Sequence, residues 1–208
     1  MNLPLVEKYL KPNSILDIGA NVGQFYHAAK KVFPEAFIFS IEGNILCERI
    51  LSKQNPNYLI RLLDSESRYR HFYINRKNIL STGSSYYKEL SPHFQFDNSK
   101  SFSIKTDRLD DVFPFQIFDL IKLDTQGSEL DILKGGLNLV KRTKAIIIEV
   151  SHKPYNANAP LSNDIMKYMS DINFLLKETL DTQRRTRQSD YLFLNEWWYN
   201  YYEQFMQE

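Results

Sequence analysis

The stretch SILDIGANVG, residues 14–23, decides the fold of this chain. Its first residues are apolar and partly β-branched, and a glycine-rich turn and an amphipathic segment follow at once. This pattern predicts a buried strand that runs into a helix. Gly19 and Gly23 would let the backbone turn sharply and let a ligand approach the free N–H groups of the first helical turn. The junction is therefore a candidate small-molecule site, and a tight turn without a ligand is the alternative.

The polar residues of this turn narrow the class of ligand. A dinucleotide fingerprint requires Gly-x-Gly-x-x-Gly, and Asn21 stands where the second glycine should be, so NAD is disfavoured. Asp17 places a carboxylate at the end of the strand, which suits a ligand with an ammonium group better than one with phosphates. A nucleoside amino acid such as S-adenosylmethionine fits, and the predicted cofactor-binding residues of the turn are Asp17, Gly19, Ala20, Asn21 and Gly23.

Two further predicted strands end on carboxylates. Residues 36–41 are apolar and end on Glu42, 19 positions after Gly23. An acidic residue about 20 positions after such a turn can accept hydrogen bonds from both ribose hydroxyls. The alternative for Glu42 is an N-cap of the next helix. Residues 58–63 form the other strand and end on Asp64, which would reach the adenine amino group of an adenosine or, alternatively, lie in a surface turn.

Composition and charge are those of an ordinary globular protein. The chain has 208 residues, 43% of them hydrophobic, so it can bury a substantial core, and we expect residues 1–208 to form one domain. The net charge of +1 gives no broad field for nucleic acid or an anionic membrane. The single cysteine, Cys47, excludes an intrachain disulfide and fits a reducing compartment. No apolar run approaches the ~20 residues of a membrane span, and we expect a cytoplasmic protein.

The alternation of strands and helices is interrupted at residues 65–117. Segments 70–74 and 101–105 alternate as strands do, with turn residues 81–85 between them. We interpret 65–117 as an insertion of strands and loop before the fourth core strand, which would shape the substrate side of the site. The rhythm then resumes and predicts strands at 118–123, 145–148, 174–180 and 191–194 and a helix ending at 170. The whole pattern predicts an α/β fold with a mainly parallel central sheet flanked by helices.

A second group of charged residues follows the fourth core strand. Lys122 and Asp124 are two positions apart and so face the same side of strand 118–123. Two charges on one face of a central strand are costly unless they are paired or used. In a doubly wound sheet this strand ends beside the first strand, so Asp17 and Asp124 would flank one pocket. For Lys122, a structural salt bridge is as good an interpretation as a catalytic role.

The segment SELD, residues 128–131, resembles a capping box and predicts the start of a helix there. Leu130, Leu133 and Leu137 would form its apolar face. Gly135 and Gly136 would weaken or break the helix midway.

Several segments of the chain together resemble one known family. They are LDIGANVG (16–23), DLIKLDTQGSEL (119–130), LKGG (133–136) and IEV (148–150). In this order they are similar to the FkbM-type methyltransferases, over about residues 14–194. The resemblance implies a Rossmann-like class I methyltransferase fold and an S-adenosylmethionine-dependent O-methyltransferase that acts on hydroxyls of sugars, glycolipids or polyketides.

The resemblance also implies roles for individual residues. Asp17, Gly19, Asn21 and Gly23 would belong to the first cofactor motif, with Glu42 on the ribose. Two positions depart from the family pattern: Gln126 stands where many relatives carry glutamate, and Gly43 stands where proline is common. The first departure puts in doubt a mechanism that relies on a carboxylate at position 126.

The sequence does not identify the base that methyl transfer to an alcohol requires. Asp124 and Lys122 are candidate catalytic residues at the end of the fourth core strand. His152 follows the strand that ends at Glu149, and histidine titrates near neutral pH, although a lone loop histidine is more often only solvent-exposed. Asp124 and Glu149 would alternatively hold a divalent cation that orients a substrate diol, or position the substrate by hydrogen bonds.

Other functions and partners stay open at this point. The expected partner is a small-molecule or glycan hydroxyl acceptor. A catalytically silent cofactor-binding or interaction protein is one alternative, because glycines and carboxylates give binding geometry and not chemistry. A nucleic-acid methyltransferase would show a basic track interleaved with aromatics, and the near-neutral charge argues against it. Trp197 and Trp198, in the aromatic C-terminal segment, would pack on the sheet, form a homodimer contact or offer a surface on which a sugar stacks.

Overall fold

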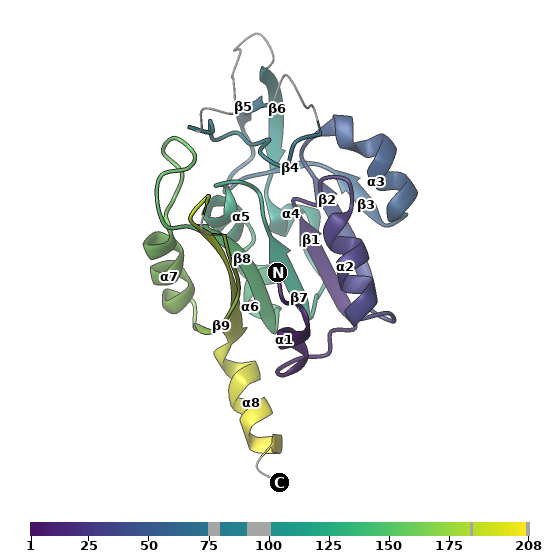
Figure 1. Cartoon of the computed structure of the whole chain (residues 1–208), viewed down its shortest axis with the longest axis vertical. Helices are drawn as coiled ribbons and strands as arrows, with labels where there is room; N and C mark the ends of the chain where they lie inside the picture. The colour runs from purple at the N-terminus through teal and green to yellow at the C-terminus, as the bar shows by residue number, and fades with distance from the viewer. Residues whose placement is uncertain (75–79, 91–100, 184, 207–208) are drawn as a thin grey trace.

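The computed structural model shows a central β-sheet covered by helices, with a smaller sheet beyond one end of its strands (Figure 1). It describes residues 1–74, 80–90, 101–183 and 185–206. Within these residues the large sheet has seven strands in the order β3-β2-β1-β7-β8-β10-β9. The strands are β1 (Ser14–Ile18), β2 (Phe37–Glu42), β3 (Tyr58–Ile60), β7 (Leu120–Leu123), β8 (Ala145–Ser151), β9 (Phe174–Gln183) and β10 (Gln188–Asn195).

The large sheet is mainly parallel, which confirms the predicted class. β1 pairs in parallel with β2 on one side and with β7 on the other, and the pairs β2–β3 and β7–β8 are also parallel. Among the described strands of this large sheet, only β10 runs antiparallel to its neighbours, β8 and β9. β7 and β8 lie inside the sheet and are buried along nearly their whole length, as their almost continuous apolar sequences require. The chain order reverses between β1 and β7, so their carboxyl ends border a crevice.

The helices that the structure describes connect these strands. The predicted helix after the glycine turn begins at Gln24 and ends at Val32, because Pro34 cannot continue it. The helices are α1 (Pro4–Glu7), α2 (Gln24–Val32), η1 (Ile45–Cys47), α3 (Glu48–Gln54), α4 (Leu109–Val112), α5 (Glu129–Gly135), α6 (Leu137–Arg142), α7 (Ser162–Asp171) and α8 (Glu196–Met206). None of the described helices is both long enough and apolar enough to traverse a membrane.

The capping-box prediction at residues 128–131 is wrong in its contacts. A helix does start there, but the Ser128 side chain makes no cap hydrogen bond and instead donates to the carbonyl of Thr125, 3.3 Å away. Glu129 accepts the backbone N–H groups of Thr125 and Gly127. The predicted break is confirmed, since α5 ends at Gly135.

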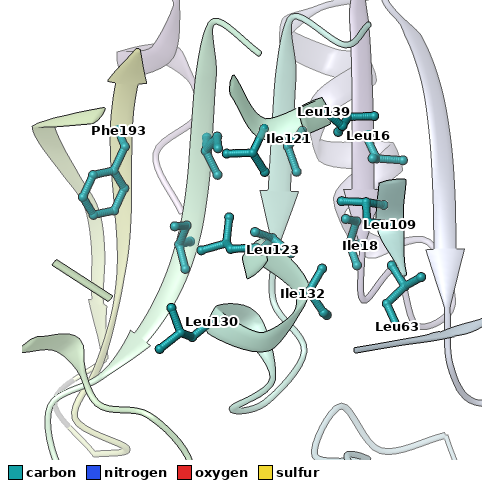
Figure 2. Packing of buried hydrophobic residues seen from close by; sticks show 14 of the residues in the cluster. Leu16, Ile18, Leu63, Leu109, Ile121, Leu123, Leu130, Ile132, Leu139 and Phe193 are labelled. Atoms are coloured by element: carbon teal, nitrogen blue, oxygen red, sulfur yellow. The ribbon is translucent and has the colours of Figure 1, made fainter. Parts of the chain in front are cut away.

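Apolar side chains form a hydrophobic cluster on each face of the large sheet. Figure 2 shows one of them, where Leu16 and Ile18 of β1 and Ile121 and Leu123 of β7 pack against Ile132 of α5 and its neighbours. The other cluster packs alternate residues of the same strands against α1, α2 and α8. Fully burying one such side chain stabilises a fold by about 1.5–3 kcal/mol. The two clusters therefore hold β1 and β7 in the centre of the sheet.

The predicted insertion folds as a second, three-stranded sheet in the order β4-β6-β5. Its strands are β4 (Leu62–Leu63), β5 (Tyr69–Tyr73) and β6 (Ser101–Asp107). The single strand predicted at 58–63 is therefore wrong: the chain leaves the large sheet after Ile60 and enters the small one at Leu62. Residues 75–79 and 91–100 of the insertion lie outside the described part of the chain.

Candidate active site

A cavity of about 350 Å³ lies at the carboxyl ends of the central strands. This volume is within the range of small-molecule sites. Its walls come from the turn after β1, the end of β2, the end of β7 and the segment 81–86 of the insertion. Segments that are far apart in the sequence therefore meet around one space, as the order of the strands requires.

Gly19 is required by the protein itself, and not only by a ligand. Its φ of +85° is a left-handed conformation that favours glycine, and a Cβ atom there would lie 1.9 Å from the carbonyl oxygen of Asp124. Asp124 in turn donates its N–H to the carbonyl of Ile18. The turns after β1 and β7 are thus in backbone contact, which brings both predicted motifs to the same place.

The backbone of the glycine turn is saturated with internal hydrogen bonds. The N–H groups of Gly19 and Ala20 both donate to the carbonyl of Ile41, and that of Gly23 donates to the carbonyl of Ala20. Gly23 has a φ of +94° and lies against Gln54 of α3. It therefore allows the turn to form but does not line the cavity. Because these N–H groups are already bonded within the protein, the turn determines the shape of the cavity and does not offer them to a ligand.

Glu42 lines the cavity and is held in place by two backbone N–H groups. Asn21 donates to Oε2 and Asn44 donates to Oε1, each at 2.7 Å. The N-cap role considered for Glu42 belongs to Asn44, whose side chain accepts the N–H of Leu46. Burial raises the pKa of Glu42, and the two N–H donors oppose this shift. Each carboxylate oxygen can accept a second hydrogen bond, so Glu42 keeps the capacity to bind hydroxyl donors.

Lys122 lies between the two aspartates predicted to flank the pocket. Its ammonium group is 3.3 Å from Oδ2 of Asp124 and 3.5 Å from Oδ1 of Asp17. Asp124 lines the cavity, whereas Asp17 is fully buried and does not. Apart from this ion pair, neither oxygen of Asp17 has a hydrogen-bond partner among the described residues. The ammonium group that Asp17 faces is therefore that of Lys122.

The protonation states of this group follow from its burial and its charges. Burial acts to lower the pKa of Lys122, but Asp124 and Asp17 raise it above the ordinary value, so the ammonium form persists. Burial raises the pKa of Asp17 to about 6 against the opposing effect of Lys122. Burial also acts to raise the pKa of Asp124, yet Lys122 and Gln126 lower it overall. Asp124 is thus an ionised carboxylate at the cavity wall.

An amide group lies between Asp124 and Glu149, where a bridging cation was one interpretation. The side-chain nitrogen of Gln126 donates to Oδ1 of Asp124 at 3.0 Å and to Oε2 of Glu149 at 2.7 Å. Within the described residues no group of three or more histidine, cysteine or acidic side chains is arranged to hold a metal ion. In this structure the Gln126 amide therefore occupies the position between the two carboxyl groups.

Two predicted site residues lie away from the cavity. His152 is exposed and contacts the hydroxyls of Ser162 and Ser189, because its loop follows the end of β8 away from β1. Asp64 is fully buried and pairs with Arg68 at 2.8 Å. The chain has already crossed to the small sheet when it reaches Asp64. Contrary to the prediction, this carboxylate does not line the cavity.

The insertion supplies cavity residues that the sequence did not single out. Ser81, Ser84, Ser85 and Tyr86 line the cavity, and the Asn21 side chain donates to the carbonyl of Ser81. The cluster of small polar residues at 81–85 indicated a turn in an insertion near the substrate. No local signal showed which side chains of that turn face the glycine turn, because only the folded insertion brings them there.

Comparison with protein families identifies the chain. The model of the methyltransferase FkbM domain matches residues 17–176, which is most of the sequence. The chain belongs to the FkbM methyltransferase family. A comparison with curated proteins finds no match.

Solved structures share the fold of this FkbM-family chain at low sequence identity. A methyltransferase FkbM from Methylobacillus flagellatus KT has a TM-score of 0.58 and 15% identity over 88% of this chain, which spans 44% of that structure's length. Magnesium protoporphyrin IX methyltransferase from Synechocystis PCC 6803, solved with bound SAM, has a TM-score of 0.52 and 11% identity over 92% of this chain and 74% of that one. The fibrillarin pre-rRNA processing protein from Methanococcus jannaschii has a TM-score of 0.53 and 12% identity, over 89% and 67%. The Rossmann-like class I methyltransferase fold is thereby confirmed.

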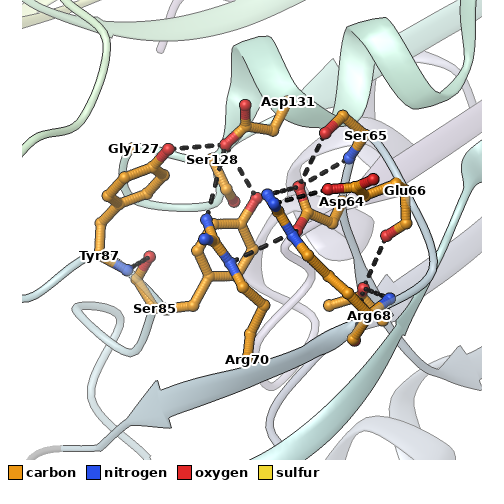
Figure 3. Close-up of polar contacts among 12 residues, drawn as sticks. Asp64, Ser65, Glu66, Arg68, Arg70, Ser85, Tyr87, Gly127, Ser128 and Asp131 are labelled. Carbon is orange, nitrogen blue, oxygen red and sulfur yellow. Dashed lines mark hydrogen bonds and ion pairs between the residues drawn. The ribbon is translucent and has the colours of Figure 1, made fainter.

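A cluster of charged and aromatic side chains connects the insertion of this family member to helix α5 (Figure 3). The Arg70 guanidinium lies 4.1 Å from the ring centre of Tyr86 and forms an ion pair with Asp64 at 3.4 Å. The hydroxyl of Tyr87 donates to Asp131 of α5 at 2.7 Å. Since Tyr86 lines the cavity, this Arg70 cluster fixes one of its walls.

Replacing Arg70 with methionine is expected to loosen that wall. The variant leaves the fully buried Asp64 with Arg68 as its remaining cationic partner, beside the hydrogen bonds from Ser65, and removes the cation from the Tyr86 ring, which should cost about 1–2 kcal/mol. Hydrogen exchange of the amides at 81–87 should then become faster.

Arg61→Met is the matched control for this prediction. Arg61 also pairs with an aspartate of the small sheet, Asp107, but both side chains are substantially exposed, so its loss should cost less than about 1 kcal/mol. Equal exchange rates at 81–87 in the Arg70 variant and the wild type would contradict the role of the Arg70 cluster.

Proposed function

We propose that this protein is an S-adenosylmethionine-dependent O-methyltransferase that acts on a hydroxyl group of a sugar, glycolipid or polyketide-type small molecule. The observation that carries this proposal is the single cavity that Gly19, Glu42 and Asp124 share. Membership of the family supports methyl transfer, and the SAM-bound relative with the same fold supports the choice of donor.

The residues of the cavity fit the proposed donor. The glycine turn borders the cavity beside β1, and Gly19, Ala20 and Asn21 line it. Glu42 would accept hydrogen bonds from the ribose hydroxyls, and the apolar side chains of Leu62, Phe72 and Ile132 offer a surface for the adenine ring. When bound, S-adenosylmethionine supplies an electrophilic methyl group attached to a positively charged sulfur.

Asp124 is the candidate that remains for the base. Lys122 is held in its charged form and has no free electron pair to accept a proton. His152 does not line the cavity. Asp124 is ionised and partly exposed to the cavity, so it is placed to take the hydroxyl proton of an acceptor in that space. Lys122 would keep this carboxylate oriented through their ion pair, and Asp17 would hold Lys122 in place by pairing with the same ammonium group.

The remaining expectations stay predictions. A catalytically silent binding protein would have the same cavity without transferring a methyl group. The fold is shared with a pre-rRNA processing protein, but the net charge of +1 still argues against a nucleic-acid acceptor. A single-domain organisation, a cytoplasmic location and a homodimer are likewise predicted and not yet tested.

Calorimetric titration with S-adenosylmethionine tests the donor, and Glu42→Gln tests its location. The wild type should bind, and the variant should bind about 10- to 100-fold more weakly, because a hydrogen bond to a charged group contributes about 1.5–3 kcal/mol. Thermal unfolding should be recorded for the variant, since its amide nitrogen would face a backbone N–H donor.

Glu48→Gln is the control for this titration. Glu48 also lies just after β2 but contacts the hydroxyl of Tyr58 and does not line the cavity, so its replacement should leave the affinity unchanged. A wild type that does not bind S-adenosylmethionine would overturn the proposed function. Equal weakening in both variants would show that the donor does not contact Glu42.

A further inference from the structure

Gln126 has an unusual backbone conformation and a fully used amide group. Its φ of +58° lies in the left-handed region, which few residues other than glycine adopt. The side chain is buried, and its NH₂ group has two protons to donate. One goes to Asp124 and the other to Glu149, at 3.0 and 2.7 Å. The conformation therefore places one donor group between two carboxyl groups.

The two carboxyl groups that Gln126 joins differ in their other contacts. Asp124 lines the cavity, and its second oxygen pairs with Lys122. Glu149 is buried behind it, and the oxygen that contacts Gln126 also accepts a hydrogen bond from Gln188 at 2.9 Å. Asp124 thus receives one cation and one amide donor, whereas Glu149 receives two neutral amides.

Burial and the neighbouring charges also make the pKa values of Asp124 and Glu149 differ. Burial raises the pKa of Glu149 well above its ordinary value, and Asp124, Glu129 and Asp190 add to this effect. The pKa of Asp124 is lowered by Lys122 and Gln126 against the effect of burial. The titratable groups that face this pair are Asp17 on β1, Lys122 on β7, Asp190 on β10 and Glu129 on α5. The pKa values of the two carboxyl groups are thus shifted in opposite directions, that of Asp124 downward and that of Glu149 upward.

We propose that Gln126 is a positioning residue that holds Asp124 ionised and directed into the cavity, and so makes Asp124, not Glu149, the carboxylate that receives the acceptor's proton. The inference rests on the proposed function for the identity of that proton. In this step the O–H bond of the acceptor breaks and its proton passes to Asp124, while the acceptor oxygen bonds to the methyl carbon as the carbon–sulfur bond of the donor breaks. Gln126 itself neither gains nor loses a proton.

Titration of the side-chain carboxyl groups by ¹³C NMR tests this inference without donor or acceptor. Asp124, assigned from the signal lost in Asp124→Asn, should titrate below the ordinary value of about 3.9 in the wild type. Gln126→Met keeps the side-chain length but removes both donors, and should raise the Asp124 titration by about one pH unit. Gln126→Glu adds a third carboxyl group and should raise it further.

Gln188→Met is the matched control, because Gln188 donates to Glu149 and makes no contact with Asp124. It should move the titration of Glu149 and leave that of Asp124 in place. An Asp124 titration that is the same in the wild type and Gln126→Met, or that moves equally in the Gln188 variant, would overturn the inference. If Gln126→Glu does not fold, the two methionine variants still decide it.

The outcome is separable from that of the proposed function. A protein that fails to bind S-adenosylmethionine would overturn the proposed function, while the carboxyl titration of the same protein would still report whether Gln126 sets the charge of Asp124. Conversely, normal binding with an unmoved Asp124 titration would overturn only the role of Gln126.

Discussion

Replacing Gly19 with alanine is expected to destabilise the protein by about 4 kcal/mol and to abolish binding in the cavity. A left-handed φ costs a residue with a side chain about 1–3 kcal/mol, and overpacking costs a further 1–3 kcal/mol. The new Cβ would lie 1.9 Å from a backbone oxygen, that of Asp124, and a backbone atom cannot rotate away as a side chain can. Urea unfolding of the wild type and the variant measures the difference.

Gly43→Ala separates this effect from the general cost of adding a methyl group beside the cavity. Gly43 also lines the cavity, but its φ is not left-handed, and the nearest atom to its new Cβ would be the end of the flexible Leu62 side chain at 2.9 Å. We expect a loss below about 1 kcal/mol. Similar losses in the two variants would show that contact between the two turns is not what requires glycine at position 19.

Lys122→Met is expected to destabilise the protein by about 3–5 kcal/mol at pH 8. Lys122 is the cation paired with the fully buried Asp17, and removing one partner of a buried ion pair leaves an uncompensated charge. Asp124 should suffer less, because it keeps the amide of Gln126 and is partly exposed. Urea unfolding at several pH values measures the free energy of unfolding.

The pH dependence of this loss identifies Asp17 as its source. In the wild type burial raises the pKa of Asp17 to about 6, above its unfolded value, so its contribution to stability is full below about pH 4 and is lost as the pH rises through 6. Without Lys122 the pKa rises further, so the loss should be small near pH 4 and grow toward pH 8.

The double variant Asp17→Asn/Lys122→Met is the control for this assignment. It removes both charges of the pair, so it should regain most of the stability that Lys122→Met loses at pH 8. A loss in the single variant that is independent of pH, or that the double variant does not recover, would contradict pairing with Asp17.

Most strands of the large sheet could be predicted because each is a short apolar run, which is a local signal. The apolar runs at 145–148 and 118–123 are long enough to bury on both sides, and β8 and β7 occur there with small differences at their ends. The prediction at 58–63 failed because YLIRLL is also one apolar run, and nothing in it marks that the chain changes sheets at Arg61. An apolar composition predicts that a segment is buried, but it does not show which sheet the segment joins.

Part of the candidate site was also predictable from strand ends. In a parallel sheet the carboxyl ends of adjacent strands meet at one edge, and this rule brought Gly19, Glu42 and Asp124 together. Asp64 and His152 follow strands in the same way but do not line the cavity. The rule needs the strand to remain in the large sheet beside β1, and the sequence does not state which strands do so.

The sequence by itself determined the strand–turn–helix unit at 14–32, the class of the sheet and the meeting of Gly19, Glu42 and Asp124 at the strand ends, because these depend on periodicity, on the backbone conformation of glycine and on the adjacency of parallel strands. Only the tertiary structure decided that Asp17 faces Lys122 and not the cavity, that Gln126 joins two carboxyl groups, and that the insertion closes one wall. These features depend on side chains that are distant in sequence and compete for the same buried partners, and that competition is resolved only when the sheet and the insertion pack together.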